Sequence, residues 1–230
     1  MQGFALKRLE RYRELAAKQI IPHLGTIALQ ALRPAQIEAW HSTLIRAGGA
    51  NGGPLSPRTV GHAHRLLHSV LEHAARLEAV GRNVASVVSP PKVGRGEIEI
   101  LTADQINAVL ARLADHSLLP IVSMALGTGM RRGELCGLAW GAVELDKATV
   151  RVERSLEETR AGLRFKQPKT VNGRRTISLA QGTVAMLREH RARQLEQRIL
   201  LGLGRLADDD LVFARPDGSP YPPDTLSRDW

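Results

Sequence analysis

A short stretch at 128–135, TGMRRGEL, carries residues suited to hold a phosphate. Its glycines allow positive φ and close approach of other backbone, so a tight turn is predicted between two apolar helical runs. Arg131 and Arg132 then stand at the start of the second helix, where a permanently charged guanidinium beside free N–H groups can bind an anion. An ordinary helix start with solvated arginines gives the same pattern, so both interpretations stay open on these residues alone.

A lysine, Lys169, lies in a second turn-like segment, 168–173 (PKTVNG). The residues on either side, 163–165 and 175–179, have the alternating pattern of β-strands. Because Asn-Gly strongly favours a hairpin turn, we expect these two strands to be joined by a turn that carries Lys169. Together with 149–152 they would form a small antiparallel sheet of three strands.

The charge of the chain favours a polyanionic partner. Its 230 residues carry a net charge of +9 with a pI near 10.5, whereas 43% apolar and 24% charged residues are ordinary for a globular protein. Residues 1–99 hold 13 lysines and arginines against seven acidic residues, so most of the positive excess lies in the first half. The length suits one or two domains, and we expect nucleic acid as the partner.

Several classes of protein are disfavoured. Cys136, the only cysteine, cannot form an intrachain disulfide, and it is expected to be a small buried residue rather than a nucleophile. Four histidines lie between 62 and 73, but no carboxylate or cysteine constellation accompanies them, so we expect no metal site. No apolar run of about 18 residues and no signal peptide are found, which predicts a cytoplasmic protein with no membrane partner.

The first part of the chain is predicted to consist of helices. Apolar residues recur at helical spacing over 4–21, and Pro22 and Gly25 are expected to end that helix. A later helix begins at Ser56-Pro57, where a capping residue precedes a residue that is pre-shaped for the first helical turn.

This later helix separates an apolar stripe from a basic face. The stripe is expected to pack inward, and its members are Val60, Ala63, Leu67, Val70, Ala74 and Leu77. The opposite face carries Arg58, His62, Arg65 and Arg76, which we expect to contact DNA. A surface helix can also be basic without binding anything, so this assignment depends on the rest of the chain.

A change of composition at 90–99 predicts a linker between two domains, 1–89 and 100–230. The second domain opens with a helix announced by the capping box of Thr102 and Gln105. The chain is therefore predicted to be mainly α-helical with a small antiparallel three-stranded sheet in the second domain, an α+β fold.

Together these features resemble the tyrosine recombinases of the phage integrase family. The family motif Thr-Gly-aliphatic-Arg-x-Gly-Glu-Leu matches 128–135, and the segment 168–170 matches the hairpin that carries the family's lysine. Residues 1–89 are similar to the helical core-binding domain of the family, and 100–230 to the first part of its catalytic domain.

The resemblance implies a role for each matched residue. Arg131 would be a catalytic arginine that meets the extra charge on phosphorus in the transition state, and Glu134 would orient its helix. Arg132, at the variable position of the motif, would contact DNA, and Lys169 would be the general acid. The partner would be double-stranded DNA, broken and rejoined through a 3′-phosphotyrosine without a metal or a nucleotide cofactor, with copies of the protein assembled on it.

Two parts of the family pattern are not matched. The family's second arginine, in a His-x-x-Arg box, and its nucleophilic tyrosine have no counterpart at the expected places. His190 and Arg193 fit the box by letter, but they lie in a long helix predicted at 183–200, where a solvated charged face is expected. Tyr12 and Tyr221 are not where the nucleophile is expected either. We therefore expect the chain, as a fragment or a degenerate relative, to be inactive alone.

Three functions remain open. The first is the DNA-binding and partial catalytic portion of a site-specific recombinase. The second is a non-catalytic DNA-binding module, such as a decayed integrase that occupies a site, and the third is a basic scaffold domain that never touches DNA. Salt separates the last from the others, because phosphate-driven binding weakens by roughly 0.9 log units per log unit of salt for each phosphate neutralised.

Overall fold

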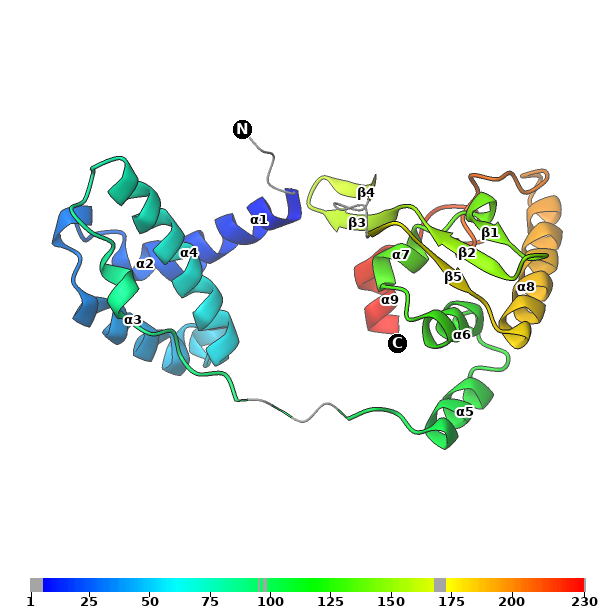
Figure 1. The fold of residues 1–230 in the computed structure, drawn as a ribbon, viewed down its shortest axis with the longest axis horizontal. Coiled ribbons are helices and arrows are strands. Elements are labelled where there is room, and N and C mark those ends of the chain that lie inside the picture. Colours follow the sequence, from blue (N-terminus) through cyan, green and yellow to red (C-terminus); the bar gives the residue numbers. More distant parts are fainter. Residues whose placement is uncertain (1–5, 95, 97–98, 168–172, 230) are drawn as a thin grey trace. The chain divides into compact units, whose positions relative to one another are not determined.

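The computed structural model describes residues 6–94, 96, 99–167 and 173–229 (Figure 1). The chain forms two compact units, Met1–Ile98 and Glu99–Trp230, and each has a hydrophobic core of its own. No helix within the described residues is long and apolar enough to cross a membrane.

The described part of the first unit is built from helices. They are α1 Leu6–Leu15, a π-helical turn Ala16–Ile20, α2 Ile21–Leu24, α3 Pro34–Ala47 and α4 Pro57–Arg76, with 3-10 turns at Leu29–Ala31, Ala50–Gly52 and Val84–Val87. Ser56 caps α4 as predicted, since its hydroxyl accepts a hydrogen bond from the N–H of Thr59 at 3.2 Å. Ile37 and Leu44 of α3 and Val60 of α4 are fully buried between the helices.

The prediction that Pro22 ends the first helix is wrong, because the helical chain continues through it. The N–H of Ile21 bonds to the carbonyl of Ala16, five residues back, so the helix widens into a π turn just before the proline. Pro22 then lies in the first turn of α2, the part of a helix in which proline is tolerated. The helix ends at Leu24, and Gly25 is its C-cap as predicted.

The buried stripe of α4 differs from the predicted one at two positions. Val70 and Leu77 are 52% and 66% exposed, while the other four predicted members are buried. Leu71 takes the inward place, because it follows Val60 by roughly three helical turns and so lies on the same side. Leu77 lies beyond the last residue of the helix and is directed away from the core.

Two histidines in the first unit form a buried pair. Nε2 of His41 lies 3.1 Å from Nδ1 of His64, and both side chains are buried. Desolvation lowers the pKa of both rings, to about 4 for His64. The pair is therefore neutral in the fold. Within the described parts of the chain, no group of three or more histidine, cysteine or acidic side chains could hold a metal ion.

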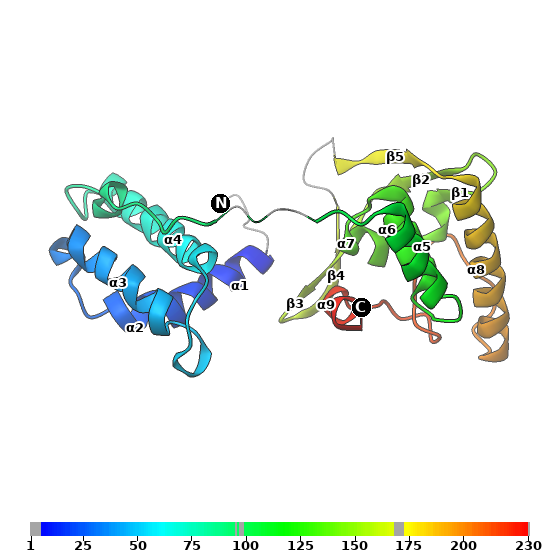
Figure 2. The same ribbon diagram turned by 90° about the horizontal axis from the view of Figure 1, so that it is seen from below.

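The second unit packs helices against one face of a sheet. Its helices are α5 Ala103–Arg112, α6 Leu119–Thr128, α7 Arg132–Cys136, α8 Gln181–Leu200 and α9 Pro223–Asp229. Its strands are β1 Val143–Glu144, β2 Thr149–Val152, β3 Ser155–Thr159, β4 Gly162–Lys166 and β5 Arg175–Ser178. Val150 and Val152 alternate inward along β2 and meet Met124 of α6 and Leu187 of α8 in the core. Figure 2 shows both helices on the same side of β2 and β5.

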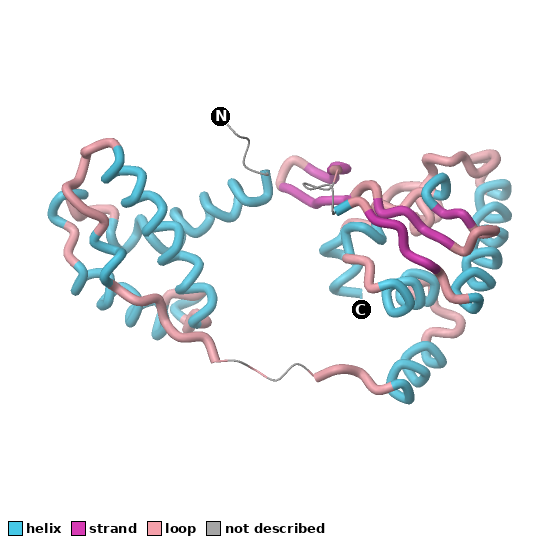
Figure 3. The backbone as a smooth tube through the Cα atoms, viewed as in Figure 1, coloured by secondary structure: helices cyan, strands magenta, loops and turns pink. Residues whose placement is uncertain are grey.

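The mainly helical fold with a small antiparallel sheet is confirmed, but the three strands are not those predicted. The order is β1-β2-β5, with Val152 opposite Arg175, and β4 pairs with β3 in a separate hairpin (Figure 3). That hairpin closes tightly between Thr159 and Gly162, whose φ of +109° suits glycine. Because β3 is the nearer partner in sequence, β4 pairs with it, and among the described residues β4 and β5 do not pair.

Candidate active site

The predicted turn joins α6 to α7. Gly129 ends α6 with a φ of +62°, in the left-handed region, and its N–H bonds to the carbonyl of Ala125 at 2.9 Å. Met130 is buried, and Arg131 is the N-cap of α7 with extended backbone. The position of Arg131 is therefore set by the junction of two helices and a buried neighbour.

The short helix α7 lies directly on the backbone of β3. A Cβ on Gly133 would stand 2.6 Å from Oγ of Ser155 and 2.7 Å from the carbonyl oxygen of Leu156. A Cβ on Gly137 would stand 2.9 Å from the backbone nitrogen of Leu156. These distances leave no room for a side chain, so both glycines are required by close approach. A helix of five residues is not stable by itself, so its packing on β3 holds Arg131 in place.

Glu134 holds Arg131 and is itself held by an arginine from the sheet. Its carboxylate accepts hydrogen bonds from the backbone N–H and from Nη1 of Arg131, each at 2.9 Å. Arg175, at the start of β5, donates Nη1 and Nη2 to the two carboxylate oxygens at 3.1 and 2.8 Å. The side chains are 9% exposed for Glu134, 31% for Arg175 and 78% for Arg131. Of the three, Arg131 presents its charge to solvent.

Glu134 is ionised in spite of its burial. Burial by itself would raise the pKa of this carboxyl, but hydrogen bonds from Arg175 and from the backbone and side chain of Arg131 lower the pKa to about 2. The N–H of Arg131 at the helix start is thus occupied by Glu134. The exposed guanidinium of Arg131 can bind an anion at this site, and the two arginines with one carboxylate carry a net charge of +1.

Arg132 is directed to the last helix of the unit. Its Nη2 bonds to Oδ1 of Asp224 at 2.7 Å, and its Nη1 bonds to the hydroxyl of Ser227, both on α9. The N–H of Asp224 in turn bonds to Oε2 of Glu158 on β3 at 3.2 Å. The predicted DNA-binding residue Arg132 therefore has a protein carboxylate as its partner and fastens α9 to α7.

Lys169, the predicted general acid, and Asn172 of its expected hairpin turn lie outside the described residues. The described cations that flank the segment have protein partners. Nζ of Lys166 bonds to Oε1 of Glu157 at 2.6 Å, and Nη2 of Arg174 bonds to the side-chain oxygen of Gln167 at 2.9 Å. The structure thus unites Arg131 with Glu134 and with β5, the strand that follows the lysine segment.

Arg175 and Arg154 are two residues whose roles the sequence did not indicate. Nε of Arg154 bonds to the carbonyl of Gly137 at 2.8 Å, and its guanidinium carbon lies 4.5 Å from the ring centroid of Phe165. It therefore ties the end of α7 to β4. The sequence offers one indication for Arg175, which is an arginine on a strand that contributes to the core. A buried carboxylate such as Glu134 needs a cation as its partner, and an arginine in that position can supply it.

The predicted DNA-binding residues of the first unit are all exposed on α4: Arg58, His62, Arg65 and Arg76. Nδ1 of His62 lies 2.8 Å from Nη2 of Arg65. Desolvation, followed by the positive charges of Arg65, Arg11 and Arg58, lowers the pKa of His62, which places Arg11 of α1 in the same group. We call Arg11, Arg58, His62 and Arg65 the basic cluster. Arg76 stands apart, roughly 16 Å further along α4 than Arg65 at 1.5 Å per residue.

His190 does not lie on a solvated helix face, so that expectation is wrong. Its Nε2 lies 2.7 Å from the carbonyl oxygen of Val212, and its ring stacks on Phe213 with centroids 5.7 Å apart. Burial lowers its pKa. Arg193 is exposed as expected, and it pairs with Glu189 on the same helix at 3.3 Å. The histidine of this His-x-x-Arg sequence therefore packs α8 against residues 212–213.

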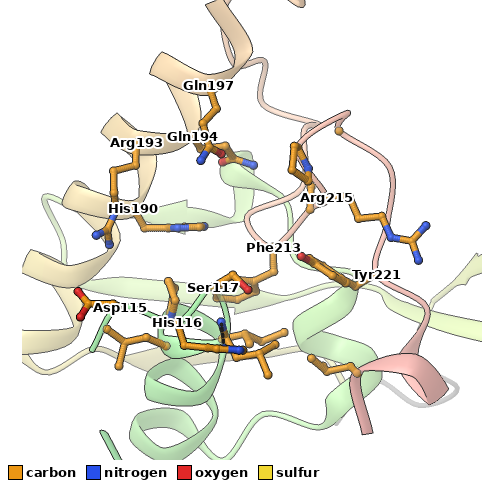
Figure 4. A pocket seen from close by; sticks show the side chains of 18 of the residues that line it. Asp115, His116, Ser117, His190, Arg193, Gln194, Gln197, Phe213, Arg215 and Tyr221 are labelled. Atoms are coloured by element: carbon orange, nitrogen blue, oxygen red, sulfur yellow. Dashed lines mark hydrogen bonds between the residues drawn. The ribbon is translucent and has the colours of Figure 1, made fainter. Parts of the chain in front are cut away.

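A cavity of about 410 Å³ lies between α6, α8 and residues 213–221 (Figure 4). Tyr221 lines it, and the guanidinium carbon of Arg215 lies 6.0 Å from the centroid of the tyrosine ring. Arg131 is not among the residues that line this cavity. The other tyrosine, Tyr12, lies on α1 in the first unit.

The sequence matches known proteins along both units. The family model of the phage integrase family matches residues 99–230, more than half of the chain. An integrase of Streptomyces ambofaciens is 29% identical over 233 residues, covering 99% of this chain and 58% of that protein. A tyrosine recombinase XerC-like protein of Caldanaerobacter subterraneus subsp. tengcongensis is 26% identical over 195 residues, covering 78% of this chain and 48% of that protein. The chain spans about half the length of these relatives.

Solved structures share the fold. The Tn1549 transposon integrase in complex with a circular intermediate DNA matches with a TM-score of 0.76 at 19% identity, over 96% of this chain and 69% of that one. A lambda integrase tetramer bound to a Holliday junction matches with a TM-score of 0.68 at 20% identity, over 99% of this chain and 59% of that one. The motif around Arg131 thus lies within a unit that matches the family throughout, and the chain belongs to the phage integrase family.

Proposed function

We propose that this chain binds double-stranded DNA and activates a phosphodiester in a tyrosine recombinase reaction. The observation that carries the proposal is Arg131, an exposed guanidinium fixed by a buried and ionised carboxylate in a member of the phage integrase family. Two of its relatives are named as an integrase and a tyrosine recombinase XerC-like protein, and structures with the same fold were solved on DNA.

The chemistry explains why a fixed cation is needed. A tyrosine oxygen attacks phosphorus, the bond from phosphorus to the 5′ oxygen breaks, and that oxygen takes up a proton. Negative charge grows on the non-bridging oxygens in the transition state, and Arg131 meets it without reorganisation because Glu134 already orients it. We assign the proton donor to Lys169. The phosphotyrosine bond conserves the energy of the phosphodiester that was broken, so rejoining needs no nucleotide cofactor.

We assign duplex binding in residues 1–89 to the basic cluster and to Arg76, with residues 90–99 as the linker to the phosphate site. These cations lie exposed on α1 and α4, where a DNA backbone can reach them. Copies of the chain on neighbouring stretches of DNA would complete the assembly, as in the lambda integrase tetramer bound to a Holliday junction.

A second candidate is a DNA-binding module that does not cleave. Tyr221 lines a cavity that Arg131 does not border, which favours this candidate. Cleavage separates the two candidates. A covalent adduct that survives denaturation on nicked duplex, and that is lost in Arg131→Ala, would support the recombinase. No adduct, with binding retained, would support the module.

Binding is tested by fluorescence anisotropy of a labelled duplex over a range of salt concentrations. Five arginines, Arg11, Arg58, Arg65, Arg76 and Arg131, would give a slope of log affinity against log salt of about −4.5. The double variant Arg58→Gln with Arg65→Gln is expected to reduce the magnitude of this slope by about 1.8. Arg188→Gln, an exposed arginine of α8 outside the proposed interface, is the matched control. Binding that does not respond to salt would contradict the proposal and favour a scaffold domain.

A further inference from the structure

We propose that Arg175 is a positioning residue of the phosphate site: by pairing with both oxygens of Glu134 it neutralises that carboxylate and leaves Arg131 free to engage DNA. The inference rests on the proposed function. It assigns Arg175 a role that its distance from the arginine motif in sequence, 41 residues from Glu134, does not suggest.

The geometry divides the carboxylate unequally between the two arginines. Arg175 reaches it with both terminal nitrogens, one on each oxygen, which is the bidentate arrangement that binds a carboxylate most strongly. Arg131 uses one guanidinium nitrogen and its backbone N–H. The pair that shares the buried charge is therefore Glu134 with Arg175, and the outward arginine keeps its remaining N–H groups for a ligand.

Counting charges gives the sign of the effect. Arg131, Glu134 and Arg175 together carry +1, so a phosphate approaching Arg131 meets a net cation. Without Arg175, the ion pair that remains is Arg131 with Glu134, and its net charge is zero. The charge of Glu134 is then balanced by Arg131 and by no other residue of the three. Without both Glu134 and Arg175 the net charge is +1 again. The role of Arg175 thus depends on the presence of Glu134.

The sheet explains why this arginine is in place. Arg175 is paired with Val152, a fully packed residue of β2, and directly opposed side chains of an antiparallel pair lie on the same face. The strand that follows the lysine segment 168–172 therefore brings a cation to Glu134 from the core side. The position of β5 therefore helps to set the orientation of Arg131 through Arg175 and Glu134.

The competing explanation is that Arg175 contacts a phosphate directly. The two differ in how substitutions combine in the salt dependence of duplex binding. We expect Arg131→Ala and Arg175→Gln each to reduce the magnitude of the slope by about 0.9, and the double variant to reduce it by about 0.9 as well. A direct contact would instead give about 1.8 in the double variant.

The decisive variant is Glu134→Gln with Arg175→Gln, which removes opposite charges and is expected to fold even where Arg175→Gln alone does not. In this variant Arg131 should again contribute about 0.9 to the magnitude of the slope, so adding Arg131→Ala should reduce that magnitude by about 0.9. A slope already lowered by about 0.9 in Glu134→Gln with Arg175→Gln would overturn the inference. Thermal unfolding of each variant shows whether it is folded. An unsubstituted chain without salt-dependent binding would sink the proposed function instead, so the two failures are distinct.

Discussion

Replacing Glu134 with glutamine is expected to weaken the second unit strongly at neutral pH and less in acid. The pKa of this carboxyl is about 2 in the fold, against a usual value of 4.5. A carboxyl whose pKa is lowered by folding adds stability above its unfolded pKa, and that stability is lost as the pH falls toward the folded value. The difference between the two values corresponds to about 3 kcal/mol in the free energy of unfolding at pH 7.

Urea unfolding followed by the fluorescence of Trp140 reports on the second unit, because Trp140 is buried in its core. Trp40 and Trp230 are changed to phenylalanine so that they do not contribute. The gap in unfolding free energy between the parent and Glu134→Gln should be about 3 kcal/mol at pH 7 and roughly half of that at pH 3. Asp146→Asn removes an almost fully exposed carboxylate and should leave a gap near zero at both values.

The comparison isolates one group, since every other carboxyl titrates in both proteins. A gap of the same size at pH 7 and pH 3 would refute the reasoning, because a folded pKa of about 2 requires this carboxyl to take up a proton in the unfolded chain before it does so in the folded chain over this range. A gap below about 0.5 kcal/mol at pH 7 would also refute it, since breaking a buried ion pair is expected to cost several times more.

Three further predictions concern packing and protonation. Gly133→Ala should destabilise the second unit by about 1–3 kcal/mol through its clash with β3, whereas Gly182→Ala on α8, where a Cβ meets nothing, should not; urea unfolding measures both. Leu71→Ala should cost about 2–5 kcal/mol in the first unit, while Val70→Ala at an exposed position of the same helix should cost less than about 0.5 kcal/mol. The pKa of His64 is lowered to about 4 in the fold, so the unfolded chain binds more protons than the folded chain between pH 6.5 and 4. The first unit should therefore lose stability as the pH falls through that range. His64→Gln should flatten this dependence in unfolding experiments followed by Trp40 fluorescence, and an unchanged profile would exclude His64 as its source.

Features that depend on neighbouring residues could be predicted from the sequence. Thr102 and Gln105 exchange the two hydrogen bonds of a capping box, at 3.3 and 2.9 Å, as their spacing indicated. Cys136 is fully buried, and burial raises the pKa of its thiol to about 11, as expected for a packing residue rather than a nucleophile. The link from Arg131 to Glu134 also spans only three residues.

Other local patterns misled where a distant or unusual arrangement decided the outcome. A proline usually ends a helix, but the chain widens into a π turn before Pro22 and the helix continues to Leu24. Alternation identified the residues of β4 as a strand without indicating its partner, because period-2 patterning carries no information on pairing. His190 has the letters of a catalytic box and serves instead as a packing contact.

By itself, the sequence determined the capped helix starts at Ser56 and Thr102 and the motif that surrounds Arg131, because caps, turns and i to i+3 contacts act within one turn of chain. Tertiary structure alone decided that Arg175 shares the carboxylate of Glu134, that β5 pairs with β2, and that Gly133 must be bare of a side chain. These relations join residues 20 to 40 or more positions apart, and their partners are chosen by sheet pairing and close packing. The charge that Arg131 presents to solvent is therefore set by the fold as much as by its own motif.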